Sequence, residues 1–434
     1  RWWRSLNDTQ LSSLEERAVT GNLDLKIAQA RIREARALRG ISKADLFPTL
    51  NASAFGTNYR SSKSSSSFEE NKLYSVGFDA GWELDVFGGV RRSVEAAQAT
   101  LEATQEDLYD VLVSLLAEVA LNYVEVRTFQ TALTVTESNI KSQEETYKLN
   151  RSRYQAGIIN ELAVQQSLYS LEQARSLIPA LQTGLEAAKN RLAVLLGQKP
   201  GAVHRELAER KPIPIPPVSV AVGVPAEAMR RRPDIRRAER DLAVQTARIG
   251  VATADLYPKF RLLGTIGLES VSTGNLFTAN SRAWTITPGI SWNIFRGGAI
   301  RQNIKVQSAR QEQALIQYES TVLNAQEEVE NVLVAYAKQQ RRRESLVAAT
   351  SAAQKAVQLG RYFTELGIIY KNMGDYYQAL NCWKEAETYY LQLQSSRYNL
   401  AYLTEREALV RYYLKEYDLA TTRFDEARQI LEEA

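Results

Sequence analysis

The chain has 434 residues, of which 44% are hydrophobic and 24% are charged, and this composition is typical of a folded protein and excludes wholesale disorder. Its 54 basic and 50 acidic residues leave a formal charge of only +4, which is too small and too dispersed for a nucleic-acid-binding protein. A single cysteine, Cys382, excludes an intramolecular disulfide and a multi-cysteine metal site, and a single histidine, His204, excludes zinc sites built on several histidines.

The N-terminal end, Arg1-Trp2-Trp3, shows no signal peptide, lipidation cysteine or initiator methionine, so we expect either a mature, trimmed chain or an engineered segment. No stretch reaches the ~18 consecutive apolar residues of a membrane helix. The longest apolar run, Val111 to Leu121, has 11 residues and contains Glu118. Hydropathy therefore indicates a soluble chain, but this test does not detect membrane strands, whose residues alternate.

Residues 47–87 are predicted to form the first β-hairpin. From Leu73 to Phe87 apolar and polar residues alternate, and the partner strand is Thr49 to Tyr59. Both strands are at least as long as the ~9–11 residues that cross a bilayer. If the hairpin spans a membrane, the alternation places Trp82 on the lipid-facing side and Asp79 and Glu83 on the side of a water-filled lumen. A half-buried sheet of a soluble domain would show the same alternation.

Long helices follow the hairpin. Apolar residues recur every seven positions from Leu112 to Tyr147, a pattern that predicts a coiled coil, and the second half of the chain repeats it from Leu315 to Tyr336. No helix breaker interrupts residues 90–156 or 299–359. About 60 residues at ~1.5 Å each make a rod of roughly 90 Å, which must pack against other helices to bury its apolar stripe.

A turn between two helices is predicted at Arg153 to Glu161. Gly157 suits the positive φ of a tight helix end. Charged Arg153 and Glu161 flank the turn, and each is as well explained by ordinary solvent exposure as by a link that closes a pore. The candidate contact residues of this turn are Arg153, Tyr154, Gly157, Ile158, Asn160 and Glu161.

A proline-rich linker is predicted at residues 201–232, because seven of the eleven prolines lie between Pro200 and Pro233. A second hairpin follows at 257–296. Its alternation places Trp284, Ile290 and Trp292 on the lipid-facing side. The same alternation places Asn293 on the lumen side.

The two hairpins belong to an internal duplication with an offset of 210 residues. Ala44-Asp45-Leu46-Phe47-Pro48 recurs as Ala254-Asp255-Leu256-Tyr257-Pro258, and Trp82 matches Trp292. The period is far longer than that of solenoid repeats. We therefore expect a first structural repeat at 1–200, the linker at 201–232 and a second repeat at 233–360.

The segment 361–434 departs from the duplication. Gly367-Ile368-Ile369 matches Gly157-Ile158-Ile159 at the same offset and suggests a second turn. The residues around and after it instead fit two tetratricopeptide-like repeats, with Trp383 in the first and Phe424 in the second. Eleven of the 21 tyrosines fall after residue 360. A natural fusion, an engineered chimera and a misread sequence are all compatible with this change.

The hairpins and rods together indicate a duct. Four strands cannot close in lipid, because an open sheet edge leaves unpaired backbone groups. Eight strands from two chains enclose an interior filled by side chains. Twelve strands from three chains are the smallest set that leaves an open lumen. No phosphate-binding loop, metal cluster or nucleophile–base pair is visible, so we expect neither an enzyme nor a cofactor.

The motifs resemble those of the outer membrane factor family of Gram-negative bacteria, the TolC-like and OprM-like channels. The resemblance covers about residues 1–360 and rests on the duplication and on four motifs, which are Ala44 to Pro48, Trp82 to Gly88, Arg153 to Gly157 and Arg231 to Ile235. It implies a mixed fold of a long helical coiled coil, or α-barrel, with two transmembrane hairpins per chain and a 12-stranded barrel in a homotrimer.

The resemblance further implies an exit duct in the outer membrane, with its helical part in the periplasm, for a tripartite efflux pump or type I secretion system. Such a duct exports drugs or other small molecules passively. The implied partners are a periplasmic adaptor (membrane fusion) protein, which meets the turn at Gly157, an inner-membrane transporter and outer-membrane lipid. The alternative is a non-membrane coiled-coil and tetratricopeptide adaptor whose hairpins form a soluble sheet.

Overall fold

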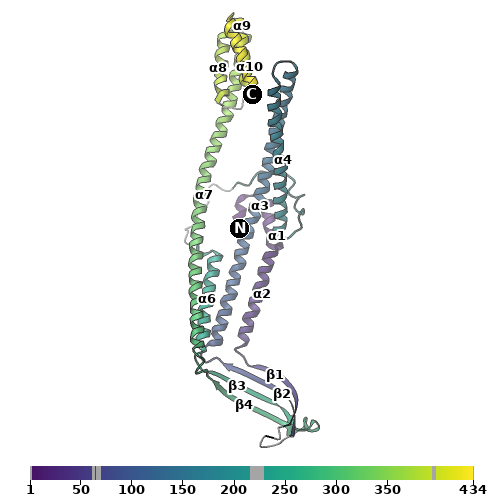
Figure 1. Ribbon diagram of the computed structural model, residues 1–434, viewed down its shortest axis with the longest axis vertical. Coiled ribbons are helices and arrows are strands. Elements are labelled where there is room, and N and C mark those ends of the chain that lie inside the picture. The colour runs from purple at the N-terminus through teal and green to yellow at the C-terminus, as the bar shows by residue number, and fades with distance from the viewer. Residues whose placement is uncertain (1, 61–63, 65–69, 216–228, 393–396, 434) are drawn as a thin grey trace.

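The computed structural model describes residues 2–60, 64, 70–215, 229–392 and 397–433. Residues 61–63 and 65–69 of the first hairpin, 216–228 of the expected linker, and 393–396 and 434 of the C-terminal segment lie outside the described residues. The molecule is strongly elongated: the helices run along its long axis and one β-sheet forms its lower end (Figure 1).

The helices of the first half begin with a short 3-10 helix, Trp2–Leu6, and α1 (Thr9–Gly21). They continue with α2 (Leu23–Ala44), α3 (Gly89–Gln155) and α4 (Glu161–Leu195). The 67 residues of α3 make a rod of roughly 100 Å. It packs against α2 and α6 toward the sheet and against α4 toward the other end.

The second half contains α6 (Pro233–Ala254) and α7 (Ala299–Asn372). Helix α7 has 74 residues, more than the roughly 60 expected. It continues through Gly360 and Gly367, so the second turn suggested near Gly367 is not formed there. Most side chains of α7 are exposed, because α6 covers only the part of it that lies near the sheet.

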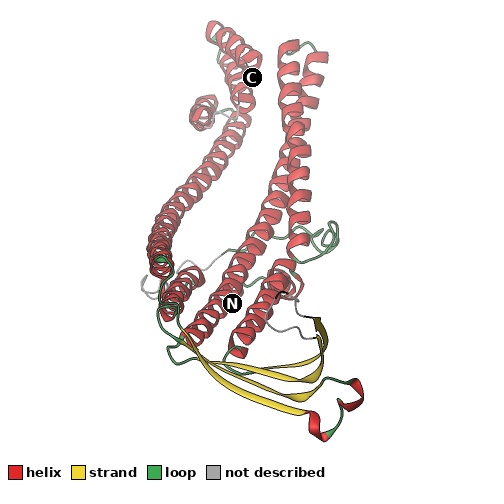
Figure 2. Ribbon diagram, turned by 60° about the horizontal axis from the view of Figure 1, so that its bottom comes forward, coloured by secondary structure: helices red, strands yellow, loops and turns green. Residues whose placement is uncertain are grey.

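The sheet joins both hairpins. It consists of β1 (Thr49–Arg60), β2 (Glu70–Leu84), β3 (Lys259–Ser270) and β4 (Arg282–Ser291), in the order β1-β2-β3-β4 with every pair antiparallel (Figure 2). Short 3-10 helices at Thr273–Asn275 and Ala279–Ser281 lie between β3 and β4. Within the described residues, the outer edges of β1 and β4 pair with no other strand.

The pairing registers of the two hairpins match residue by residue. Thr49 pairs with Gly81 in the first hairpin, and Lys259 pairs with Ser291 in the second. Both members of the second pair stand 210 positions after those of the first. The two hairpins are therefore the same structure made twice.

The ends of β2 and β4 differ from the expected ones. Strand β2 ends at Leu84 rather than Phe87, because Asp85 turns to cap α3 and accepts hydrogen bonds from the backbone N–H groups of Val90 (3.1 Å) and Arg91 (2.8 Å). Strand β4 ends at Ser291. Trp292 and Asn293, expected within the strand, therefore lie just beyond it.

The main hydrophobic core lies midway along the molecule. It joins α1, α3, the end of α4 and the segment after α4; its fully buried residues include Leu11, Leu14, Val119, Tyr123, Leu192 and Leu207. Buried Arg127 ties these elements together, because its guanidinium donates to the Glu209 carbonyl at 2.8 Å and to the Gln10 side chain. This core and these hydrogen bonds hold α1 and the segment after α4 against α3.

The C-terminal segment forms two antiparallel helix pairs at the end opposite the sheet (Figure 1). The end of α7 packs against α8 (Tyr376–Gln392), and α9 (Arg397–Tyr413) packs against α10 (Tyr417–Glu433). Trp383 is 1% exposed and donates its indole N–H to the Thr364 carbonyl at 3.2 Å. Gly367 lies beneath this indole, where a Cβ atom would lie 2.2 Å from Nε1. Small residues here therefore allow the tryptophan to reach the helix backbone.

Candidate functional site

The sheet has one apolar and one polar face, because the registers of all three strand pairs keep the alternating sets aligned. Phe78 pairs with Ala52 and Ile266, and Ile266 pairs with Trp284. The apolar face contains Leu50, Ala52, Ala54, Val76, Phe78, Ala80, Trp82, Leu84, Phe260, Leu262, Ile266, Leu268, Trp284, Ile286, Pro288 and Ile290. Three sequence-predicted residues, Trp82, Trp284 and Ile290, are therefore on one face.

The apolar face is open in the single chain. Trp284 is 72% exposed, Ile286 65% and Ile290 69%. Soluble monomers rarely expose continuous apolar patches of more than a few hundred Å². This face therefore requires a cover of apolar material.

The opposite face is mostly polar and internally bonded. Ser53 donates its hydroxyl to Asp79 at 2.6 Å, and Glu83 forms ion pairs with Arg261 at 3.3 Å and Lys259 at 3.9 Å. The predicted polar residues Asp79 and Glu83 are on this face, although Leu263 and Phe55 interrupt it. The predicted Asn293 is beyond the end of β4 and belongs to the connection to α7.

The junction between helices and sheet contains a matched pair of tryptophan contacts. Trp82 donates its indole N–H to the Leu46 carbonyl at 3.0 Å, and Trp292 donates to the Leu256 carbonyl at the same distance. Each contact ties a strand end to the turn that follows a helix. Trp82 is thus partly buried by a structural contact, and the repeat of the Ala-Asp-Leu motif and of tryptophan at one offset was the signal that could have predicted this bond.

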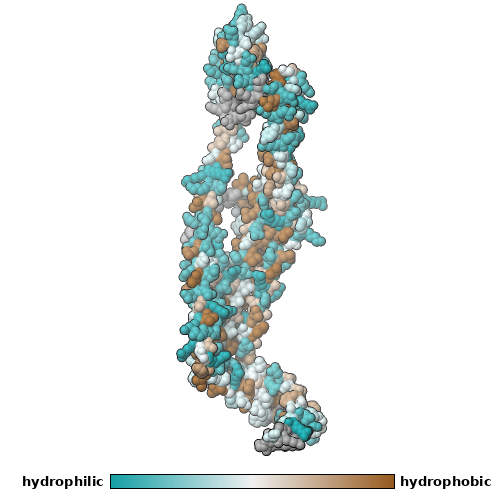
Figure 3. All heavy atoms as spheres, viewed as in Figure 1, coloured by the Kyte–Doolittle hydropathy of each residue, from teal (hydrophilic) through white to brown (hydrophobic). Residues whose placement is uncertain are grey.

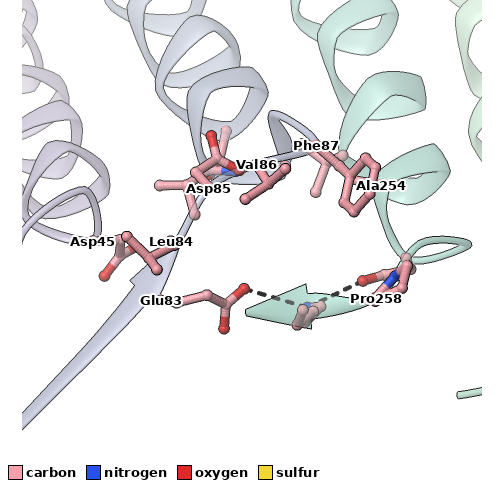
Figure 4. Close-up of a pocket in the computed structure, with 14 residues that line it drawn as sticks. Asp45, Glu83, Leu84, Asp85, Val86, Phe87, Ala254 and Pro258 are labelled. Carbon is pink, nitrogen blue, oxygen red and sulfur yellow. Dashed lines mark hydrogen bonds and ion pairs between the residues drawn. The ribbon is translucent and has the colours of Figure 1, made fainter. Parts of the chain in front are cut away.

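A pocket at the same junction lies between the two halves of the chain (Figure 4). Asp45, Glu83 and Asp85 of the first half line it together with Ala254 and Pro258 of the second. Although burial opposes it, the hydrogen bonds from Val90 and Arg91 and the Arg91 guanidinium lower the pKa of Asp85 below its ordinary value. The ionised carboxylate keeps the start of α3 in place.

The tip of the α3–α4 pair is a compact turn at the other end of the rod (Figure 1). Gly157 has a φ of 75°, as expected, and the Ile158 N–H donates to the Arg153 carbonyl at 2.9 Å. The Asn160 side chain caps α4 by accepting from the Ala163 N–H at 3.1 Å. Ile159 is buried against Val164, the arrangement of a hydrophobic staple.

Three large side chains at this tip face solvent. Tyr154 is 44% exposed, Ile158 59% and Leu162 56%. Glu161 is also exposed. The turn holds its own backbone rigidly while presenting apolar groups outward, which suits it for contact with another protein. The sheet and the tip are thus two separate candidate sites at opposite ends of one rod.

Among the described residues, no helix combines the length and the apolar character that a membrane span needs.

Comparisons with known proteins agree with this geometry. The family model "Outer membrane efflux protein" matches residues 14–198 and 224–399. The match passes the limit of about residue 360 that the sequence motifs suggested and includes α8.

Individual relatives cover most of the chain. Nodulation protein T of Rhizobium leguminosarum bv. trifolii is 32% identical over 361 residues, which are 82% of this chain and 77% of the relative. Outer membrane protein OprJ of Pseudomonas aeruginosa is 32% identical over 373 residues, 84% of this chain and 77% of that protein. The structure of the outer-membrane channel OprN has a TM-score of 0.76 at 31% identity and covers 100% of this chain and 92% of that one.

The two-faced sheet, the long helical rod and these matches lead to one assignment. The chain belongs to the outer membrane efflux protein family and is an exit duct of efflux pumps in the outer membrane of Gram-negative bacteria.

Proposed function

We propose that three copies of the chain form a passive duct, in which the sheets close into a 12-stranded barrel in the outer membrane and the helices form an α-barrel in the periplasm. The observation that carries this proposal is the sheet with one exposed apolar face, one polar face and two open edges. Lipid would cover the apolar face and water would fill the space against the polar face. The duct would use no cofactor and perform no catalysis.

The open edges of β1 and β4 support the trimer. In a bilayer an unpaired strand edge costs several kcal/mol for each unsatisfied backbone group, so β4 of one chain must pair with β1 of another. Two chains would give eight strands, whose interior is filled by side chains. Three chains give twelve strands and leave room for water.

We assign the sheet residues to the two environments by their face. Trp82, Trp284 and Ile290 would face lipid, with Trp82 at the periplasmic boundary because its indole is bonded to the helix end. Asp79 and Glu83 would face the lumen. Trp292 and Asn293 follow β4 and would lie at the periplasmic rim of the barrel.

We propose that the tip contacts a periplasmic adaptor protein that links the duct to an inner-membrane transporter. Tyr154, Ile158 and Leu162 supply apolar contact area. Gly157 and Asn160 fix the turn, and Arg153 and Glu161 flank it on the two helices. In a trimer these charges would recur three times around one opening, so replacing both by Ala should raise single-channel conductance if they hold the duct closed.

The C-terminal helix pairs are consistent with tetratricopeptide-like hairpins, with Ala379, Trp383 and Ala386 packed inside. Two such hairpins are fewer than the three that are stable alone, so they would depend on α7 for support. The family match through α8 favours a segment of the duct itself over a separate module. The non-membrane adaptor considered from the sequence is not supported, because the relatives are outer-membrane efflux proteins.

Two single lysine substitutions at adjacent positions of β4 test the assignment of faces. Ile286→Lys places a charge in the middle of the apolar face, where lysine costs about 2–4 kcal/mol in lipid, and should reduce assembly into the outer membrane. Thr285→Lys is on the polar face beside Thr265 and should assemble normally and shift ion selectivity in planar bilayers toward anions. Equal assembly of the two variants would refute the assignment.

A further inference from the structure

An aromatic contact joins the two halves of the chain at the junction of rod and sheet. The ring of Phe87, which follows β2, stacks on Tyr257 with centroids 4.6 Å apart and an interplanar angle of 17°. Phe260 at the start of β3 lies next to them, 6.3 Å from the Phe87 centroid. This contact covers the edge where the first hairpin ends and the second begins, as Figure 4 shows for Phe87 beside Ala254.

The matching residues at the outer edges of the chain are uncovered. The positions 210 residues before Tyr257 and Phe260 are Phe47 and Leu50, which are 67% and 69% exposed. They lie at the start of the first hairpin, beside the open edge of β1. One half of the contact is thus present at β1 without its partner.

The position beyond β4 that matches Phe87 is Gly297, and an aromatic residue stands two positions before it. The connection from Trp292 to Gly298 has the same length as that from Trp82 to Gly88, and both glycines begin a long helix with a φ of 81°. It contains Phe295, which is 88% exposed, two positions earlier than Phe87 in its own connection. Figure 3 shows hydrophobic residues where the lower end of α7 meets the sheet.

We propose that Phe295 of one copy packs against Phe47 and Leu50 of the partner subunit and closes each junction between copies. The partner is a second copy because a duplicated unit that repeats around a ring meets the next chain as its first half meets its second. The inference rests on the ring of copies proposed above. It adds the residues of the contact and its register.

The register follows from the pair β2–β3. Ala80 of β2 pairs with Gly264 of β3. The position 210 residues after Ala80 is Ile290, and the position 210 residues before Gly264 is Ala54, so Ile290 should lie opposite Ala54 of the partner subunit. The same shift replaces the charged residues of the internal junction by neutral ones. Glu83 with Lys259 and Arg261 corresponds to Asn293 with Thr49 and Asn51. The contact between copies therefore relies on the apolar cluster and should be insensitive to salt.

Cross-linking tests this contact directly. The variant carries Phe47→Cys and Phe295→Cys in a Cys382→Ser background, and the purified protein in detergent is treated with a short bismaleimide. We expect dimer and trimer bands on a denaturing gel with loss of the monomer band. The matched control, Phe87→Cys with Tyr257→Cys, should react within one chain and keep the monomer mass.

A second pair of cysteines, placed too far apart to be linked, is the negative control for the cross-linking. Phe277 is 80% exposed but lies between β3 and β4 at the far end of the hairpin, so Phe47→Cys with Phe277→Cys should give no linked species. Native mass measurement of each variant reports the oligomer independently. A trimer that gives no band above the monomer with the 47–295 pair would overturn the contact and leave the duct intact, with these aromatics covered by lipid. A protein that is monomeric in detergent would instead contradict the proposed trimer.

Single substitutions test the same contact without a cross-linking reagent. Phe295→Asp should lower the temperature at which the trimer dissociates in detergent, whereas Phe277→Asp should leave it unchanged. Equal dissociation temperatures for the two variants and the parent would also overturn the contact.

Discussion

Glu15 is a buried carboxyl group without a partner in the main core. It lies on α1 between Leu11, Leu14 and Ala18, and its side chain is 0% exposed. Neither carboxylate oxygen accepts a hydrogen bond within the described residues. Desolvation by burial penalises the charged form and raises the pKa of Glu15 from 4.5 to about 8.

The sign of the pH effect follows from this raised pKa. The unfolded chain loses the Glu15 proton near pH 4.5, whereas the folded chain keeps it to about pH 8. The contribution of Glu15 to the free energy of unfolding is therefore fully present below pH 4.5 and is lost as the pH rises to about 8. At ~1.4 kcal/mol per pKa unit, the loss between these limits is of the order of 3–5 kcal/mol.

The test compares Glu15→Gln with the parent protein. Glutamine keeps the shape and cannot ionise, so its denaturant midpoint should fall less between pH 5 and pH 8.5 than that of the parent, as measured by helix content and tryptophan fluorescence. The neighbouring Glu16→Gln is the control, because Glu16 is exposed and makes only a surface pair with Arg4. A parent whose midpoint changes no more than that of the Glu15→Gln variant would refute the reasoning.

Three further predictions concern single contacts. Trp82→Phe removes the indole bond to Leu46 and should cost about 1 kcal/mol, seen as a lower dissociation temperature of the assembled protein. Gly367→Ala pushes a Cβ into Trp383 and should destabilise the C-terminal helix pairs by about 1–3 kcal/mol, seen as faster proteolysis of that segment. Asn160→Ala removes the cap of α4 and should cost about 1 kcal/mol. Hydrogen exchange should become faster at the tip, and the exchange rate of the sheet should not change.

Strict alternation made the faces of the sheet predictable from sequence. In a strand, successive side chains point to opposite sides, so the order of residues from Tyr74 to Leu84 already sorts apolar from polar groups. The duplication then extended the result, because matching hairpins have matching registers. Gly157 was predictable for a similar local reason, since a tight helix end needs a positive φ.

Contacts between distant segments were not predictable in the same way. Strand β2 ends early because Asp85 bonds to the backbone of α3, which depends on where that helix begins. The stacking of Phe87 on Tyr257 joins residues of different repeats, and no spacing within either repeat encodes it. Periodicity describes one element at a time, whereas these bonds arise from how elements meet.

The two tips show how local caps decide where a long helix ends. Gly157 ends α3 because Asn160 three residues later caps the next helix. Gly367 stands 210 positions after Gly157, but the residue in the place of Asn160 is Tyr370, which offers no short capping side chain, and α7 continues.

Helix α7 ends only where a glycine and a capping residue recur together. Gly374 has a φ of 81°, and Asp375 accepts a hydrogen bond from the Gln378 N–H at 3.2 Å at the start of α8. This turn comes seven residues later in its repeat than the turn at Gly157, counted with the offset of 210. Seven residues are two helical turns, or roughly 10 Å of rod. Helix α7, with 74 residues, is therefore longer than α3, with 67, by about this length. If the adaptor proposed above contacts both turns, its surface must accommodate that step.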